Sequence, residues 1–141
     1  MENQTENQTE TIKQTPDVAI KRSIKEIVAD LSKPVAQKHL STRKQGGKDL
    51  TFISWHHAEG YLDYFASGWK KEIKEVMNIA GKVAITVRII IPCLEGEVWR
   101  EATGCEDENT NSFGDSFSNA ESMALRRACA NFGLGRYLYQ K

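Results

Sequence analysis

Two adjacent arginines, Arg126 and Arg127, are the clearest candidates for chemistry, because they stand among small residues in the segment SFSNAESMALRRACANFG. A guanidinium group carries a permanent charge and several N–H donors, which suit it to the oxygen atoms of phosphate. At 100° per residue, Ala120, Ala124 and Ala130 fall in the sector of these arginines. This low surface would let a phosphate backbone or a neighbouring subunit approach the helix closely. The alternative interpretation is a solvated arginine pair on an alanine-rich helix.

The helix that must position these arginines is predicted from its two ends. Ser118 and Glu121 have the spacing of a capping box at a helix start, and Gly133 directly follows Phe132, as glycine often follows a helix end. Between them, an apolar face that includes Leu125 and Phe132 predicts packing against a core. The arginine pair is therefore expected on a long C-terminal helix.

The run Phe117–Tyr139 contains the patterns AE-x-x-ALRRA and NFGLGRYLY. It resembles the C-terminal helix of the Rad fifty-two type single-strand annealing proteins, especially the bacterial and phage branch that includes the DNA-damage-response A proteins. The resemblance implies a β-β-β-α core and assembly into rings or short helical filaments. It further implies binding of single-stranded DNA in a basic outer groove, and ATP-independent annealing of complementary strands in recombination and DNA repair. Such a protein is not an enzyme and needs no cofactor.

The resemblance also identifies candidate DNA contacts. Arg126 and Arg127 match the family's basic pair, whereas Ala130 stands where the eukaryotic branch has a further basic residue. Other candidates rest on position and charge alone, and these are Arg136, Lys48, Arg43, Lys44 and Arg88. Arg88 interrupts an apolar strand, so it is either a paired structural charge or a ligand-facing group. Tyr137 and Tyr139 are expected to dock into the core rather than to stack on bases.

The beginning of the chain divides into a tail and a domain. Residues 1–14 repeat ENQT and are almost free of large apolar side chains, which predicts a disordered tail before a single-strand annealing domain at residues 15–141. Thr15 followed by proline is typical of a helix start, and the apolar spacing predicts one helix that ends before Pro34.

The middle of the chain is expected to change from a loop to a helix. The basic stretch Lys33–Leu50 predicts an irregular loop around two glycines, which could follow an irregular polyanion. After it, Ser54 can cap a helix that ends before Gly68, with Trp55 and Phe65 among its core residues.

Three strands are predicted between this helix and the arginine helix, at Lys70–Met77, Lys82–Ile91 and Glu97–Thr103. Their connections are short enough for hairpins, so the strands form an antiparallel meander with its middle strand most buried. The fold class is α+β: N-terminal helices, then a three-stranded antiparallel β-meander packed against a long C-terminal helix.

The 141 residues carry no net charge, but the charge is segregated along the chain. Residues 21–48 have a net charge of +6, residues 95–121 of −7 and residues 122–141 of +4. A neutral chain of this kind can still present a basic groove to single-stranded DNA. Further copies of the chain are expected partners, a single-strand-binding protein is a further candidate, and no membrane association is expected.

The three cysteines fit no metal motif, and the sequence has no signal peptide or long apolar run. We therefore expect a cytoplasmic protein of a bacterium, or a phage protein within its host cell. The adjacent His56 and His57 lack the i, i+4 spacing of a helical zinc site, and no metal is expected.

Two other functions stay open. One is a metal-dependent nuclease that would use Asp107, Glu108 and Asp115 of the acidic segment Cys105–Asp115, which is otherwise expected to be a mobile connection. The other is a protein-interaction module that has the fold without the annealing activity.

Overall fold

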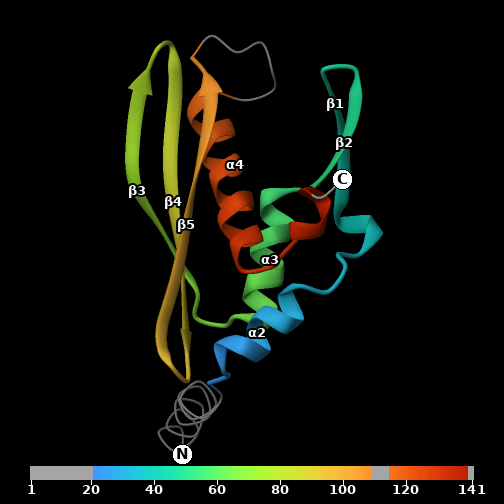
Figure 1. The fold of residues 1–141 in the computed structure, drawn as a ribbon, viewed down its shortest axis with the longest axis vertical. Helices are drawn as coiled ribbons and strands as arrows, with labels where there is room; N and C mark the ends of the chain where they lie inside the picture. Colours follow the sequence, from blue (N-terminus) through green and yellow to red (C-terminus); the bar gives the residue numbers. More distant parts are fainter. Residues whose placement is uncertain (1–20, 109–114, 140–141) are drawn as a thin grey trace, which may run out of the picture.

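The computed structural model describes residues 21–108 and 115–139 of the chain. The elements follow in the order α2 (Ile24–Leu31), η1 (Gln37–His39), β1 (Leu40–Gln45), β2 (Lys48–Ile53), α3 (Trp55–Phe65), β3 (Lys70–Ile79), β4 (Lys82–Cys93), β5 (Gly96–Asp107), α4 (Ser116–Asn131) and η2 (Arg136–Tyr139). Strands β3, β4 and β5 form one antiparallel sheet, while β1 and β2 form a separate hairpin. Figure 1 shows the helices on one face of the three-stranded sheet, with α4 running along it. The predicted α+β fold with its β-β-β-α core is confirmed.

Strand β4 is the buried centre of the sheet, as predicted. Ile85, Val87, Ile89 and Ile91 are fully buried. Since alternate residues of a strand share a face, these four side chains form the face that packs against α4. All three strands extend beyond their predicted ends, because each hairpin turn needs only two residues between the last paired positions.

Helix α4 lies unusually close to β5 because Gly104 has no side chain. A Cβ atom at Gly104 would lie 2.3 Å from the carbonyl oxygen of Ala120 and 2.6 Å from the backbone nitrogen of Ala124. Ala120 and Ala124 are accordingly buried. The expectation that these alanines form an open surface for DNA or a subunit is wrong, because β5 covers Ala120 and Ala124 and Ala130 is buried as well.

The first turn of α4 also differs from the prediction of a capping box at Ser118. The N-cap is Asp115, whose carboxylate accepts a hydrogen bond from the backbone N–H of Ser118 at 2.7 Å. A carboxylate is favourable there because of the positive end of the helix dipole. Glu121 instead forms an ion pair with Lys71 of β3 at 2.8 Å. The central residues of the predicted acidic loop, 109–114, lie outside the described residues.

Helix α2 begins later than the predicted helix. The predicted start at Thr15 and the predicted tail both lie outside the described residues. Residues 21–23 are not helical, and the side chain of Ser23 caps α2 by accepting a hydrogen bond from the N–H of Glu26 at 3.2 Å. The predicted continuous helix is therefore wrong over these residues, because a serine cap begins a new helix there.

The start of α2 is fastened to the turn between β4 and β5. The backbone N–H of Ile24 donates to the carboxylate of Glu95 at 2.9 Å. In the same turn, the N–H of Leu94 donates to the carbonyl of Arg22, also at 2.9 Å. The turn between β4 and β5 thus holds the start of α2 in place.

The stretch predicted as an irregular basic loop, Lys33–Leu50, contains β1 and the first half of β2, which pair as a hairpin. Its six residue pairs run from Leu40 opposite Ile53 to Gln45 opposite Lys48. Gly46 and Gly47 form the turn with φ values of 60° and 79°, which suit a two-residue hairpin connection. The loop prediction was wrong because the Gly-Gly pair was interpreted as flexibility rather than as turn geometry.

Helix α3 has the predicted bounds, although its first turn differs in two details. Ser54 occupies the N-cap position, but its side chain makes no capping hydrogen bond. Trp55, predicted to lie in the core, is 48% exposed. The reason is that the buried stripe of α3 is formed by Ala58 and Leu62, one and two turns further along.

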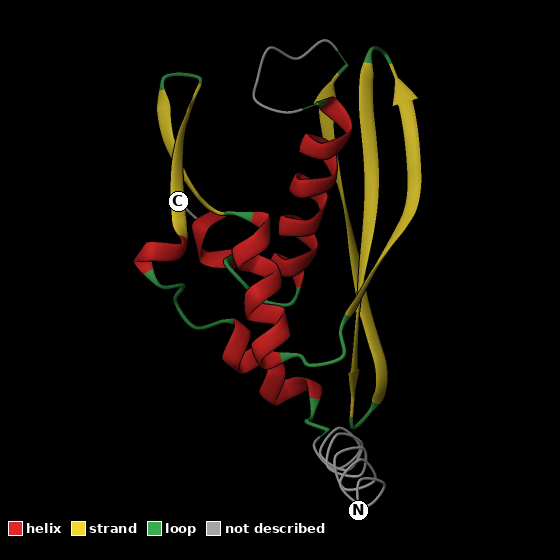
Figure 2. Ribbon diagram, turned by 180° about the vertical axis from the view of Figure 1, so that it is seen from behind, coloured by secondary structure: helices red, strands yellow, loops and turns green. Residues whose placement is uncertain are grey.

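Strand β3 forms an exposed edge of the sheet. All ten of its residues are exposed, although four of them, Ile73, Val76, Met77 and Ile79, are large and apolar. Figure 2 shows the cause, since β3 lies on the side of the sheet away from α4, which packs mainly over β4 and β5. A long uncovered edge with apolar side chains is available for pairing with another chain.

Candidate nucleic-acid interface

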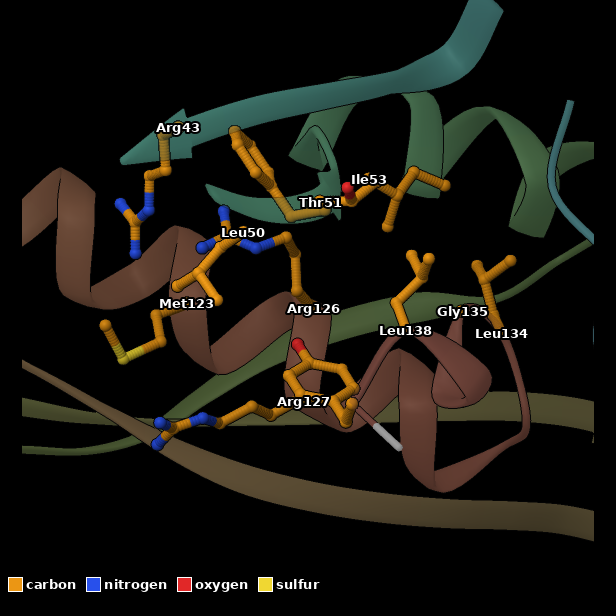
Figure 3. Close-up of a pocket in the computed structure, with 12 residues that line it drawn as sticks. Arg43, Leu50, Thr51, Ile53, Met123, Arg126, Arg127, Leu134, Gly135 and Leu138 are labelled. Carbon is orange, nitrogen blue, oxygen red and sulfur yellow. The ribbon is translucent and has the colours of Figure 1, made fainter. Parts of the chain in front are cut away.

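A hollow of about 200 Å³ lies between the β1–β2 hairpin, α4 and η2, and it is the candidate interface. The side chains that define it come from all three elements, namely Arg43, Leu50, Phe52, Met123, Arg126, Arg127, Leu138 and Tyr139. We call this hollow the arginine groove. Figure 3 shows Arg43 extending from the hairpin toward α4, the helix that carries Arg126 and Arg127.

The register of the hairpin decides which of its basic residues share a face with Arg43. Cross-strand partners lie on the same face, and Arg43 is opposite Leu50. Since faces alternate along a strand, Lys48 and Phe52 share this face, whereas Lys44 lies on the other one. Both lysines are exposed.

The ring of Phe52 contacts two of the guanidinium groups. The guanidinium carbon of Arg43 lies 5.6 Å from the ring centroid, and that of Arg126 lies 5.2 Å from it. Contacts of this kind are attractive, because the ring faces carry partial negative charge. Two like charges are thereby held side by side in a partly apolar setting.

Burial lowers the pKa of Arg126 from its ordinary value, and a hydrogen bond with the hydroxyl of Tyr139 acts in the opposite direction. An arginine stays protonated throughout the physiological range, so the group remains a cation. A partly desolvated cation interacts more strongly with an anion than a fully hydrated one does. Arg126 is thus the least exposed of the three arginines, and its charge would act most strongly on a nearby anion.

Arg127 is exposed, and one of its nitrogen atoms, Nη1, donates to the carbonyl of Thr103 on β5 at 2.8 Å. Guanidinium has five N–H donors, so this bond fixes the side chain and leaves donors for a ligand. The structure therefore brings Arg43, Arg126 and Arg127 together, from parts of the chain more than 80 residues apart.

Two other predicted contacts lie elsewhere. Arg136 donates to the carbonyl groups of Ala130 and Asn131 at 2.9 and 3.0 Å, where it satisfies the end of α4. Arg88 is paired with Glu101 at 3.0 Å, and its guanidinium carbon lies 3.5 Å from the ring centroid of Trp99. Its neighbours in β4 face α4, so Arg88 faces away from the helix and the groove.

Two aromatic residues of the groove, Phe52 and Tyr139, were not predicted to lie there. Phe52 was missed because no strand was predicted between the basic stretch Lys33–Leu50 and the helix after Ser54, although the alternation of Leu50, Thr51 and Phe52 is typical of a strand. The prediction of docking into the core is wrong for Tyr137, which is 39% exposed, although its hydroxyl accepts a hydrogen bond from the N–H of Val35 at 3.0 Å. It is also wrong for Tyr139, which lines the groove and is 55% exposed, because η2 turns its side chain toward α4.

Within residues 21–108 and 115–139, no group of three or more His, Cys, Asp or Glu side chains is placed to hold a metal ion. Over the same part of the chain, no helix has the length and apolar character needed to cross a membrane.

Known proteins resemble this chain over most of its length. The model of the family described as "Rad52/22 family double-strand break repair protein" matches residues 23–141. Two relatives come from Arabidopsis thaliana, and each is 34% identical to the chain. DNA repair RAD52-like protein 1, mitochondrial, aligns over 135 residues, which are 94% of this chain and 77% of the relative. DNA repair RAD52-like protein 2, chloroplastic, aligns over 127 residues, which are 87% of this chain and 64% of the relative.

Proposed function

Because the chain belongs to the Rad52/22 family of double-strand break repair proteins, we propose that it binds single-stranded DNA and anneals complementary strands without ATP. The observation that carries this proposal is the convergence of three arginines on one groove. Residues 15–141 would form the annealing domain, and homologous recombination and repair would be the setting.

The groove suits this activity because arginine recognises phosphate and leaves the bases free. A strand held by its phosphates keeps its pairing edges available to a second strand. Formation of the duplex then supplies the free energy, since stacking contributes on average about 1.4 kcal/mol per base-pair step. Annealing therefore needs no nucleotide hydrolysis and no catalytic residue.

The geometry ranks the proposed contacts. Arg43, Arg126 and Arg127 would bind phosphate within the groove, and Lys48 shares the hairpin face of Arg43. Lys44 would add a weaker contact from the opposite face of the hairpin. The bonds of Arg88 and Arg136 to other parts of the fold favour structural roles for these two residues.

We further propose that copies of the chain associate through β3 into a ring or short helical filament. The support is the exposed edge itself, where Ile73, Val76 and Ile79 are each at least 44% exposed. Association through a strand edge also repeats the groove along the assembly, which would let one strand of DNA contact several copies. A single-strand-binding protein stays a proposed partner, and a bacterial or phage origin with a cytoplasmic location stays a prediction.

The direct test replaces the groove arginines and measures the salt dependence of binding to oligo-dT. For single strands, the slope of log K against log salt changes by about 0.7 for each phosphate that is no longer neutralised. Removing Arg43, Arg126 and Arg127 together should flatten the slope by about 2 and abolish annealing. Lys25→Ala, which removes an exposed charge on α2 remote from the groove, is the matched control.

Each competing function has its own outcome. If the triple variant keeps the affinity and salt slope of the wild type, the groove is not the DNA site. If light scattering shows a monomer that ignores oligo-dT, the chain is an interaction module without annealing activity. Cutting of a labelled strand on addition of a divalent metal would instead indicate a nuclease.

A further inference from the structure

A second hollow, of about 410 Å³, lies where η1 meets one side of α3, along the whole length of that helix. Apart from Gly60, every side chain that lines it carries an aromatic ring, and these are His39, His56, His57, Tyr61, Tyr64 and Phe65. We call this site the aromatic hollow. Planar rings on several sides suit a planar ligand, since stacked rings attract one another.

The three histidine rings lie in a row, with His57 stacked on His39 and tilted by 38° relative to His56. The ring centroids of His39 and His57 are 4.5 Å apart with an interplanar angle of 27°, and those of His56 and His57 are 4.3 Å apart. Histidines can approach this closely in the neutral form, whereas two protonated rings would repel one another. Burial lowers the pKa of His57, the central ring of the three, which favours its neutral form.

Hydrogen bonds hold these rings in a fixed orientation. The hydroxyl of Tyr61 accepts a bond from the N–H of Ala36 at 3.0 Å, so its own proton is available to Nδ1 of His39, 2.9 Å away. The hydroxyl of Ser54 lies 2.8 Å from Nδ1 of His57, which explains why it makes no capping bond. The rings are therefore held in place before any ligand arrives, which lowers the entropic cost of binding.

Gly60 has no side chain, so it leaves space in the middle of the hollow. A glycine inside a helix costs about 1 kcal/mol relative to alanine. A Cβ atom at Gly60 would have no neighbour within 4 Å, so packing within the chain does not require glycine there. Its effect is to leave the backbone of α3 open between the rings of His56 and Tyr64, and the ring of Tyr64 is itself 81% exposed.

The charges around the hollow are compatible with a strand of DNA. The two carboxylates of α3 nearest to it in sequence are engaged elsewhere, since Glu59 lies 3.9 Å from Lys71 and Asp63 accepts from the indole N–H of Trp69. No carboxylate lines the hollow among the described residues. The arginine groove is also near along the chain, because Ile53 lines the groove and His56 lines the hollow.

We propose that the aromatic hollow holds one base of the single strand whose phosphates occupy the arginine groove, stacked on the exposed rings of α3. This inference rests on the proposed function and adds to it a base contact beside the phosphate contacts. Stacking of a base on an aromatic ring tolerates any sequence, because every base has a flat face. A base held there would be withdrawn from pairing until the second strand displaces it.

The test compares Gly60→Leu, which fills the hollow, with Gly60→Ala, which raises helix propensity by a similar amount but leaves most of the space. Two strands of equal length are titrated, one of oligo-dT and one in which every nucleotide is abasic, so that only the bases differ. The wild type should bind oligo-dT about tenfold more tightly than the abasic strand. Gly60→Leu should remove this preference without weakening binding to the abasic strand, while Gly60→Ala should keep it.

The other outcomes overturn the proposal in distinguishable ways. If Gly60→Leu retains the full preference, the hollow holds no base, although the groove assignment survives. If Gly60→Leu weakens binding to both strands equally, the preference for bases survives a filled hollow, so the hollow holds no base and the loss of affinity comes from a change in the fold. If the wild type binds neither strand, the proposed function fails as well. Saturable binding of free thymidine monophosphate at micromolar concentration would assign the hollow to a free nucleotide instead.

Discussion

Replacement of Gly104 by alanine tests whether the close contact between α4 and β5 supports both the fold and the groove. The added Cβ would lie 2.3 Å from the carbonyl oxygen of Ala120, 2.6 Å from the nitrogen of Ala124 and 2.9 Å from the Cβ of Met123. Two of these atoms belong to the helix backbone, so no side-chain rotation can relieve the overlap. The helix must retreat by about 1 Å to restore an ordinary contact.

Overpacking of this kind typically costs about 1 to 3 kcal/mol, and a clash with backbone places Gly104→Ala at about 3 kcal/mol. For a domain of this size the melting temperature should fall by about 10 °C, which calorimetry measures directly. Arg127 bonds to the carbonyl of Thr103, the neighbour of Gly104. A retreat of α4 should therefore also weaken binding to oligo-dT.

The matched control is the same substitution at Gly60, which lies in a helix with open space around it. Gly60→Ala should raise the melting temperature slightly, because alanine has the higher helix propensity. Equal melting temperatures for Gly104→Ala and the wild type would refute the reasoning, since they would mean that α4 does not pack against β5 at this distance.

Three other predictions concern Arg136, His57 and the cysteines. Arg136→Ala should lower the free energy of unfolding by about 1 to 2 kcal/mol, because it removes two hydrogen bonds to the end of α4. The salt slope of DNA binding should stay unchanged. A flatter slope would instead place Arg136 in the DNA-binding site. Burial, followed by the charges of the neighbouring histidines, lowers the pKa of His57 from its ordinary 6.5. The unfolded chain therefore binds a proton at His57 more readily than the folded chain does, and the free energy of unfolding should fall as the pH drops below about 6.5. The fall should be smaller in His57→Gln. Burial raises the pKa of the Cys129 thiol to about 12, and Cys93 is also buried. A thiol reagent should therefore modify only Cys105 in the folded protein. Rapid modification of all three cysteines would contradict this fold.

The main elements of the fold could be predicted from sequence because their signals are local. The β-branched run of β4 and the alternation on either side of it specify a meander without any knowledge of distant residues. The hairpin of β1 and β2 was missed, since its basic side chains mask the strand pattern. The alanine face of α4 was misinterpreted, because only the space left by Gly104 shows what covers it.

The candidate site was predicted in part. Arg126 and Arg127 could be found because they are adjacent and match a family motif. The place of Arg43 depends on the hairpin register, and the sequence does not show that the hairpin lies over α4. The structural contacts of Arg88 and Arg136 depend on partners in the folded chain, so the sequence left the role of Arg88 open and suggested a DNA contact for Arg136.

The bond between Ile24 and Glu95 has a consequence for the order of folding. It joins residues 71 positions apart, and the Glu95 carboxylate is in place only once β4 and β5 have paired through their short turn. Closing a long loop costs more entropy than forming a hairpin, so local pairing should come first. Helix α2, although it precedes the sheet in the chain, is then expected to dock only after the sheet has assembled.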